Sequence, residues 1–276
     1  MFKTTENSLQ YVDCHSHLFD DMFNEDLDKV IEKAKDRNVA AALVCSVTVR
    51  DFPKVLYLSE KYQDFVVPCL GIHPVQKDEK GEQMCVKHTD ISEALSLIEK
   101  HKDVIGAVGE IGLDFQPRIT PTSEEKDVQR AVLKAQVELA NKLNIPINVH
   151  SRSAGKPTID ALKELKPASV LLHAFDGRPA VAMEGVKEGY FFSIPPSIIR
   201  SEQMKLVKQL PIENIVLETD SPGLGPVKGE RNEPSNISVS CDYVAKIKGM
   251  KVEDVMKITT MNAIKIFPRL KSFINI

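Results

Sequence analysis

Short apolar runs, rich in β-branched residues, alternate along the chain with longer segments whose apolar positions recur every three or four residues. The short runs predict eight strands, at 11–18, 39–47, 65–72, 104–111, 145–150, 169–174, 189–194 and 214–219. The longer segments predict helices at 24–37, 51–62, 89–101, 122–143, 156–165, 178–187 and 200–209, followed by two more at 234–248 and 252–266. No change of composition marks a linker, so we expect one α/β domain.

The helix expected at 122–143 carries the clearest local signals. Its first residues, Thr122-x-x-Glu125, match a capping box. The face expected to pack on the sheet consists of Val128, Val132, Ala135 and Leu139.

Eight strands that are each followed by a helix indicate a parallel sheet, because parallel strands need crossover connections. Such a sheet is either a closed (β/α)8 barrel or an open, doubly wound sheet, and periodicity alone fits both. The segments 76–88 and 221–233 are expected to be long irregular loops.

Composition and charge narrow the class of protein. The chain has 276 residues, of which 42% are hydrophobic and 27% charged, which is typical of a globular protein and excludes disordered and fibrous classes. With 36 Lys and Arg against 39 Asp and Glu, the net charge of −3 excludes a broadly basic nucleic-acid coat protein. It leaves room for an enzyme that binds phosphate locally.

The five cysteines are odd in number, scattered and never spaced as C-x-x-C. This pattern argues against a disulfide framework and a cysteine zinc site, and it favours a reducing compartment. Residues 1–10 lack the apolar core of a signal peptide, and no run approaches the roughly 18 apolar residues of a membrane span. We therefore expect a cytoplasmic or nuclear protein.

Polar residues that can do chemistry recur where the apolar runs stop. The first strand ends in His15-Ser16-His17, and side chains two apart on a strand share a face, so both imidazoles can approach one ion. Taken singly, each of these residues has another explanation in a hydrogen bond at a barrel rim. Together, the strand-end histidines and carboxylates match the carboxyl-end site of an α/β barrel and are numerous enough for a two-metal centre.

Seven motifs resemble the TatD family of metal-dependent deoxyribonucleases, in particular its animal branch, within the amidohydrolase superfamily. They are DCHSHL (13–18), GIHP (71–74), GEIGLD (109–114), VHSR (149–152), HAFDG (173–177), ETDSP (218–222) and RNEP (231–234). The resemblance implies a single-domain (β/α)8 TIM barrel over 1–276. It also implies two or three divalent ions, Zn²⁺, Mn²⁺ or Mg²⁺, at the mouth of the barrel.

The resemblance also assigns roles to single residues. His15 and His17 would bind one metal together with Asp220, His150 and His173 would bind a second, and Glu110 would bridge the two. Asp220 and Glu110 are the expected catalytic residues. On this reading the ions activate a water molecule, and Asp220 orients it and accepts its proton.

Other residues are candidates for substrate binding or for orienting the ligands. Arg152 suits a phosphate because a guanidinium matches its oxygens bidentately, and Arg231, Asn232 and His73 are further candidates. The alternatives are a salt bridge at the rim for either arginine and a structural hydrogen bond for His73. Asp13 and Glu218 are expected to orient ligands, unless they form buried ion pairs, and Asp114 either does the same or caps a loop.

The expected function is hydrolysis of phosphodiester bonds in DNA, from a 3′ end or at damaged sites. The alternatives are a metallohydrolase acting on a small phosphoester, lactone or amide, for which the arginines would matter little, and a non-catalytic scaffold. DNA is the expected partner. We expect a monomer with no membrane and no obligate protein partner.

Overall fold

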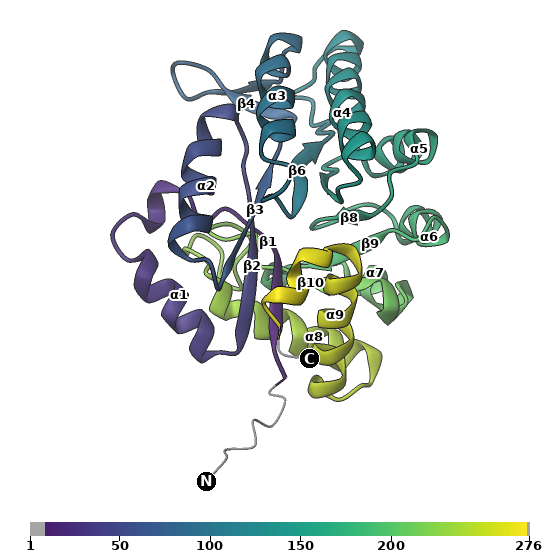
Figure 1. Cartoon of the computed structure of the whole chain (residues 1–276). Coiled ribbons are helices and arrows are strands. Elements are labelled where there is room, and N and C mark those ends of the chain that lie inside the picture. The colour runs from purple at the N-terminus through teal and green to yellow at the C-terminus, as the bar shows by residue number, and fades with distance from the viewer. Residues whose placement is uncertain (1–8, 275–276) are drawn as a thin grey trace.

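Eight parallel strands form a nearly closed barrel in the computed structural model, which describes residues 9–274 (Figure 1). In sheet order the strands are β1 (Tyr11–Ser16), β2 (Val39–Cys45), β3 (Val66–Leu70), β6 (Ala107–Gly112), β7 (Ile147–His150), β8 (Val170–Leu172), β9 (Phe191–Ile194) and β10 (Ile215–Leu217). The seam between β10 and β1 is joined by two backbone hydrogen bonds, from Asp220 N–H to the His15 carbonyl (2.8 Å) and from His17 N–H to the Ser221 carbonyl (2.7 Å). The expected barrel is confirmed, and the open sheet is wrong.

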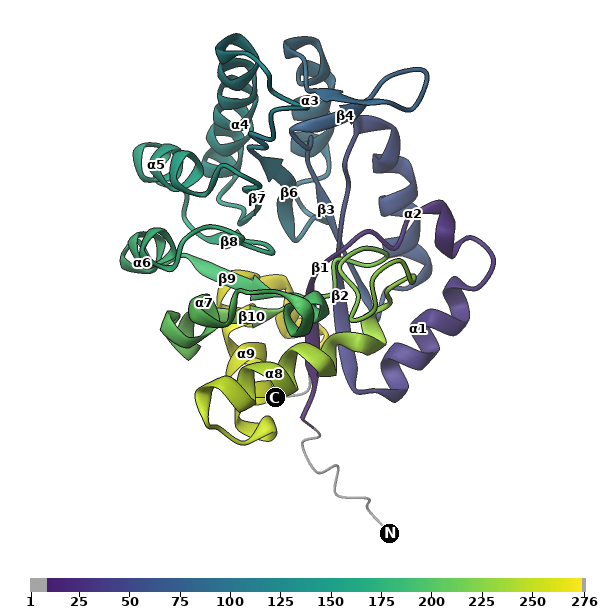
Figure 2. The ribbon, with the colours of Figure 1, turned by 180° about the vertical axis from the view of Figure 1, so that it is seen from behind.

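Helices surround this barrel on its outer face (Figures 1 and 2). They are α1 (Leu27–Asp36), α2 (Phe52–Lys61), α3 (Ser92–Lys100), α4 (Ser123–Leu143), α5 (Gly155–Leu165), α6 (Pro179–Lys187), α7 (Met204–Gln209), α8 (Ile237–Lys248) and α9 (Val252–Ile266). Short 3-10 turns occur at Asp21–Phe23, Val49–Asp51, His88–Asp90, Pro196–Arg200, Ile212–Asn214, Pro234–Asn236 and Pro268–Ser272. The helices expected from 24, 200 and 234 begin at Leu27, Met204 and Ile237, and in the last of these segments the turn Pro234–Asn236 takes up the first residues.

The segment 76–88, expected to be irregular, contains a β-hairpin, so that expectation is wrong. Strands β4 (Val75–Lys77) and β5 (Gln83–Cys85) pair antiparallel, and Gly81 takes a left-handed φ of 82° in the turn between them. The Asp78 side chain accepts hydrogen bonds from the backbone N–H groups of Lys80 and Glu82 and so holds the turn. Strands of three residues are too short for an alternating pattern to reveal them. The second expected loop, 221–233, has no helix or strand.

The capping box expected at the start of α4 is present, since Thr122 accepts a hydrogen bond from Glu125 N–H and Glu125 accepts one from Thr122 N–H. The buried face is rotated from the expected one. Val132 and Leu139 are buried as expected and Val128 and Ala135 are half-buried, whereas two glutamines of this helix are completely buried, Gln129 and Gln136.

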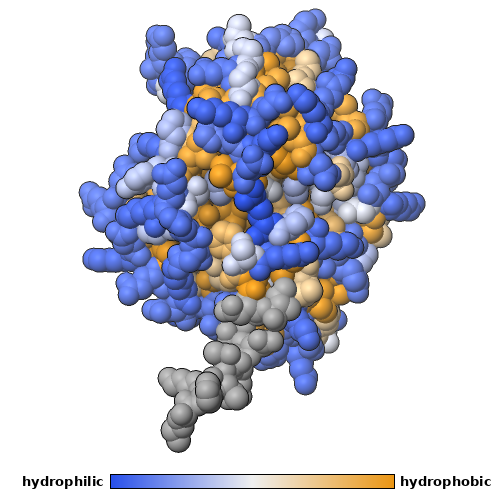
Figure 3. All heavy atoms as spheres, in the orientation of Figure 1, coloured by the Kyte–Doolittle hydropathy of each residue, from blue (hydrophilic) through white to orange (hydrophobic). Residues whose placement is uncertain are grey.

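Helix α9 and the turn after it close the amino end of the barrel (Figure 1). Their apolar residues, among them Ile264 and Phe267, pack in one cluster with barrel residues such as Val12 and Leu171. Polar side chains hold the starts of strands, as Asn262 does by donating to the Ile212 and Ile215 carbonyls at 2.8 Å. Figure 3 shows hydrophilic residues over most of this face, with apolar residues in smaller areas between them. The open end is therefore the carboxyl end of the strands.

Two expectations reach the ends of the chain. The expected domain spans 1–276, and the segment expected to lack a signal peptide spans 1–10. Residues 1–8 and 275–276 of these segments lie outside the described residues. Within residues 9–274, no helix is both long enough and apolar enough to cross a lipid bilayer.

Candidate metal centre

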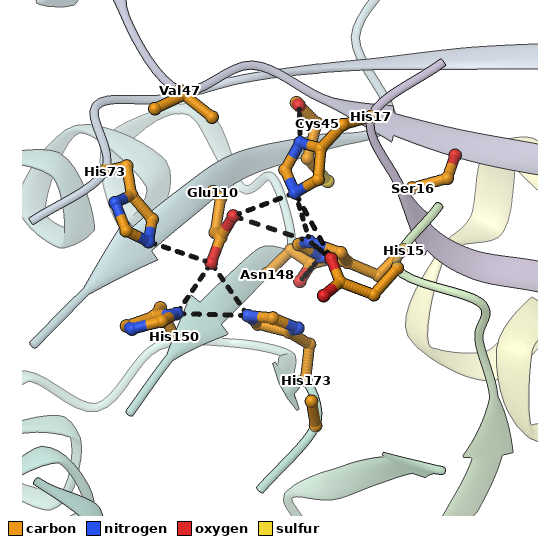
Figure 4. A network of polar contacts seen from close by, with 12 residues as sticks. His15, Ser16, His17, Cys45, Val47, His73, Glu110, Asn148, His150 and His173 are labelled. Atoms are coloured by element: carbon orange, nitrogen blue, oxygen red, sulfur yellow. Dashed lines mark hydrogen bonds and ion pairs between the residues drawn. The ribbon is translucent and has the colours of Figure 1, made fainter. Parts of the chain in front are cut away.

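The strand ends bring five histidines around one buried carboxylate, that of Glu110 on β6 (Figure 4). One carboxylate oxygen, Oε1, lies 3.3 Å from His73 Nε2, 2.8 Å from His150 Nδ1 and 2.7 Å from His173 Nε2. The other, Oε2, lies 3.4 Å from the Nε2 atoms of both His15 and His17. Glu110 therefore faces imidazoles from both sides of the barrel mouth.

Asp220, just after β10, completes the side of the centre next to β1. Its Oδ1 lies 3.5 Å from His15 Nε2 and 3.3 Å from His17 Nε2. Its φ of 54° is in the left-handed region, which Asp tolerates better than most residues. Since its N–H donates to the His15 carbonyl, the turn that presents the carboxylate is tied to β1.

The donor atoms of these residues fit divalent ions. Three groups each keep their donor atoms within 4.8 Å of one another: His15, His17 and Asp220; His15, Glu110 and His173; and His73, Glu110 and His150. Glu110 and His15 each belong to two groups, as expected for ions that share ligands. Imidazole nitrogen and carboxylate oxygen are donors for Zn²⁺ and Mn²⁺, and the carboxylates also suit Mg²⁺.

The second ring nitrogen of most of these histidines has a partner of its own. His17 Nδ1 lies 2.8 Å from the Cys45 carbonyl, His15 Nδ1 lies 2.9 Å from Asn148 Oδ1, and His150 Nε2 lies 3.2 Å from Asp114 Oδ2. A ring N–H that donates to such an acceptor leaves the other nitrogen free to bind a metal. In each case that other nitrogen faces Glu110.

The charges around the centre favour the ionised form of its carboxylates, which is the form that binds a metal ion. Burial raises the pKa of Glu110, but the surrounding imidazoles, led by His73, His173 and His15, outweigh it and hold this pKa well below the usual range. Burial lowers the pKa of His17, but hydrogen bonds to Asp220 and Glu110 outweigh it and raise this pKa to about 10. The carboxylate of Glu110 is therefore ionised at neutral pH.

Close backbone approach lets β6 and β7 present their candidate ligands side by side. Gly112 has a φ of 150°, and a Cβ there would lie 2.0 Å from the His150 carbonyl oxygen. Only glycine fits such a contact, so this residue allows Glu110 and His150 to come within 2.8 Å.

Asp114 and Glu218, two of the residues expected to orient ligands, each lie next to a histidine of the centre. Asp114 accepts a hydrogen bond from Gln116 N–H as well as contacting His150, so it caps its loop and contacts a candidate ligand. Glu218 is fully buried, accepts a hydrogen bond from Ser193 Oγ at 2.7 Å and lies 3.6 Å from His173 Nδ1.

Asp13 lies one layer deeper and holds the turn that carries Asp220. Its carboxylate accepts hydrogen bonds from the N–H (2.8 Å) and the hydroxyl of Thr219. Burial raises the pKa of Asp13 to about 8 against these hydrogen bonds. Within the described residues, neither Asp13 nor Glu218 is paired with a lysine or arginine, so the alternative of a buried ion pair with such a residue is not observed.

Three positioning residues escaped the sequence analysis: Asn148, Gln129 and Gln136. Gln136 accepts a hydrogen bond from Ile72 N–H (2.8 Å) and donates one to the Ile72 carbonyl (3.1 Å), next to His73. Gln129 accepts from Asp114 N–H (2.8 Å) and donates to the Pro74 carbonyl (3.1 Å). The available signal was two glutamines seven residues apart, hence on one face of a helix, among apolar neighbours.

Replacing Gln136 by leucine should lower the free energy of unfolding by about 1–3 kcal/mol, because the N–H and carbonyl of Ile72 lose their side-chain partner in the core. Urea unfolding measures this as a lower midpoint at unchanged m value. Gln209→Leu, at an exposed position of α7, is the matched control. Equal midpoints for the two variants would contradict the role assigned to Gln136.

The four expected substrate-binding residues divide into two pairs. His73 and Arg152 line a groove of about 1760 Å³ that contains Glu110 and Asp220 at the barrel mouth. Arg231 and Asn232 are not among its lining residues.

Arg231 and Asn232 instead hold the 221–233 loop in place, near β1 at the mouth (Figure 2). Arg231 pairs with both carboxylate oxygens of Asp26 (2.7 and 2.6 Å) and lies over the Phe23 ring. Asn232 is fully buried and donates to the Thr219 carbonyl at 2.7 Å. Their side chains are thus engaged within the fold.

Solved structures share this architecture. A TatD family hydrolase of Entamoeba histolytica superposes with a TM-score of 0.81 at 25% identity, covering 94% of this chain and 98% of the other. The TatD homologue YJJV of Escherichia coli superposes with a TM-score of 0.83 at 22% identity over 94% and 98%, a likeness of fold.

Sequence comparison identifies the family. Deoxyribonuclease TATDN3 of Homo sapiens is 57% identical over 94% of this chain and 95% of its own length. An uncharacterized metal-dependent hydrolase of Methanocaldococcus jannaschii is 34% identical over 95% and 98%. The profile of the family described as TatD related DNase matches residues 12–268. The chain therefore belongs to the TatD-related DNase family.

Proposed function

We propose that this chain is a metal-dependent deoxyribonuclease that hydrolyses phosphodiester bonds in DNA. The observation that carries the proposal is the convergence of five imidazoles and Asp220 on the buried carboxylate of Glu110, inside a groove open to substrate. The relative named deoxyribonuclease covers nearly the whole chain.

The donor groups support two or three divalent ions, Zn²⁺, Mn²⁺ or Mg²⁺. His15, His17 and Asp220 would hold one ion, and His150 and His173 would hold a second ion. Glu110 would bind both ions, and His73 could contribute to a third. When bound, such ions supply positive charge to the phosphoryl oxygens and lower the pKa of a coordinated water.

The chain's own residues would do the rest. The Asp220 side chain, 18% exposed, reaches the groove and can orient the attacking water and accept its proton. Glu110, almost fully buried, would hold its charge in place without reorganisation. Arg152 is exposed at the groove, where its guanidinium would bind phosphate oxygens, and His73 lines the same groove 3.3 Å from Glu110.

The size of the groove favours a polymeric substrate. Pockets for small molecules usually measure about 300–1,000 Å³, and this groove, at about 1760 Å³, exceeds that range. A small phosphoester, lactone or amide would leave much of it unfilled.

All candidate ligands come from one chain, so we infer a monomer that needs no partner subunit. The five cysteines are free, which favours the cytoplasm or nucleus.

Cleavage of a single-stranded DNA oligonucleotide with added Zn²⁺, Mn²⁺ or Mg²⁺ tests the function, with elemental analysis of the purified protein. His15→Ala and Asp220→Asn should each abolish cleavage, whereas His88→Ala, at an exposed position, should not change it. Unchanged activity in both site variants would overturn the proposal. End-labelled substrates with and without a lesion distinguish removal of nucleotides from the 3′ end from cutting at damage.

A further inference from the structure

The groove contains positive charges that have no acidic partner among residues 9–274. Its lysines and arginines are Arg50, Lys54, Lys77, Lys80, Lys87, Arg118 and Arg152. Lys54 pairs with Asp21 at 2.8 Å, but across residues 9–274 the other six form no salt bridge. Several cations elsewhere on the surface do pair, for example Lys142 with Glu99 and Lys156 with Asp160. Unpaired cations that gather in one groove are available for an anionic ligand.

These six cations occupy one half of the barrel rim. Arg50 follows β2, the three lysines lie in or beside the β4–β5 hairpin after β3, Arg118 follows β6 and Arg152 follows β7. These four strands are consecutive in the barrel. Among described residues, the other half of the rim, after β8, β9, β10 and β1, brings no lysine or arginine to the groove, and it contributes Asp20, Asp21, Asp176 and Asp220.

Most acids on the cationic half are occupied by backbone groups. Asp51 accepts hydrogen bonds from the N–H groups of Val47 and Thr48, Asp78 caps the hairpin turn, and Asp90 accepts from Lys87 N–H. Glu79 and Glu93 also line the groove. Within residues 9–274, none of these acids forms a salt bridge with one of the six cations, so the cations remain available to phosphate groups.

The hairpin is fixed beside the metal centre. Gln76 on β4 donates hydrogen bonds to the carbonyls of His73 (2.8 Å) and Val47 (3.0 Å). It therefore links the hairpin to the loop after β2 and to a candidate ligand. A strand whose scissile phosphate lies at Glu110 would have its neighbouring phosphates within the same groove.

We propose that the β4–β5 hairpin, with Lys77, Lys80 and Lys87, binds the phosphates of the DNA strand next to the scissile bond, so that this strand lies over the β2–β3 side of the rim. Arg50 extends this surface toward α2. The proposal rests on the deoxyribonuclease function proposed above and assigns the direction in which the substrate leaves the centre. Backbone contacts of this kind bind DNA irrespective of base sequence.

The test compares two triple variants that remove the same charge. Lys77→Gln, Lys80→Gln and Lys87→Gln change the hairpin, and Lys187→Gln, Lys208→Gln and Lys257→Gln change exposed lysines outside the groove. Both are assayed on a single-stranded 20-nucleotide DNA and on bis(4-nitrophenyl) phosphate, a phosphodiester with no neighbouring phosphates. Melting temperatures of both variants check folding.

The hairpin variant should lose at least about tenfold in kcat/KM on the oligonucleotide, mainly through KM, and keep its rate on the small diester. In a plot of log KM against log salt concentration, the slope for this variant should be smaller by about 0.7 for each phosphate that it no longer binds. Equal oligonucleotide kinetics in the two triple variants would overturn the proposal. If the wild type cleaved neither substrate, the deoxyribonuclease function itself would be overturned. The failure of this proposal and the failure of the function are therefore distinguishable.

Discussion

Glu110→Gln should lower kcat/KM for DNA by about 10²–10⁴-fold and reduce the bound metal in parallel. The carboxylate faces five imidazoles within 3.4 Å and belongs to two of the three candidate ligand groups. An amide of the same shape keeps the packing but removes the negative charge. Losing one preorganised electrostatic group of an active site costs about 10²–10³-fold in kcat, and weaker metal binding adds to this loss.

Steady-state kinetics and elemental analysis of the same preparation measure both effects. Glu164→Gln, an identical change at an exposed position of α5, is the control and should match the wild type. A Glu110→Gln variant that retains full metal content and activity would exclude Glu110 as a shared ligand. Its melting temperature shows whether the fold is intact.

The position of the candidate site residues could be predicted from the sequence, because a barrel brings the carboxyl ends of its strands together whatever segments connect them. The eight expected strands correspond to β1, β2, β3, β6, β7, β8, β9 and β10, although the observed strands are shorter at one or both ends. His15, Glu110 and Asp220 are far apart in sequence but adjacent in space, because each ends a neighbouring or facing strand. Periodicity left the barrel and the open sheet equally possible, and the family resemblance favoured the barrel.

Contacts between elements could not be predicted in the same way. The sequence left Arg231 as either a phosphate ligand or a partner in a rim salt bridge, and only the tertiary structure shows that Asp26 pairs with it. Gln136 looked like an ordinary helix residue, and only the tertiary structure places its amide on the backbone of Ile72. Both roles depend on partners more than 60 residues away in sequence.

Metal removal should lower the melting temperature strongly, because the ligands tie together strands from the whole barrel. The candidate ligand groups join residues at the ends of β1, β6, β8 and β10 and of β3 and β7. An ion that binds only the folded state stabilises it by about 4 kcal/mol when its free concentration is 1,000 times Kd. For a domain of this size, 1 kcal/mol corresponds to about 2–4 °C, so we expect a fall of about 8–16 °C.

Thermal unfolding followed by circular dichroism, before and after dialysis against a chelator, measures this fall, and adding back Zn²⁺ or Mn²⁺ should reverse it. His15→Ala removes a donor that two ligand groups share, so its melting temperature should respond much less to chelation. His88→Ala should respond like the wild type. If chelation of the metal-loaded wild type left its melting temperature unchanged, the histidines around Glu110 would be held by protein hydrogen bonds alone.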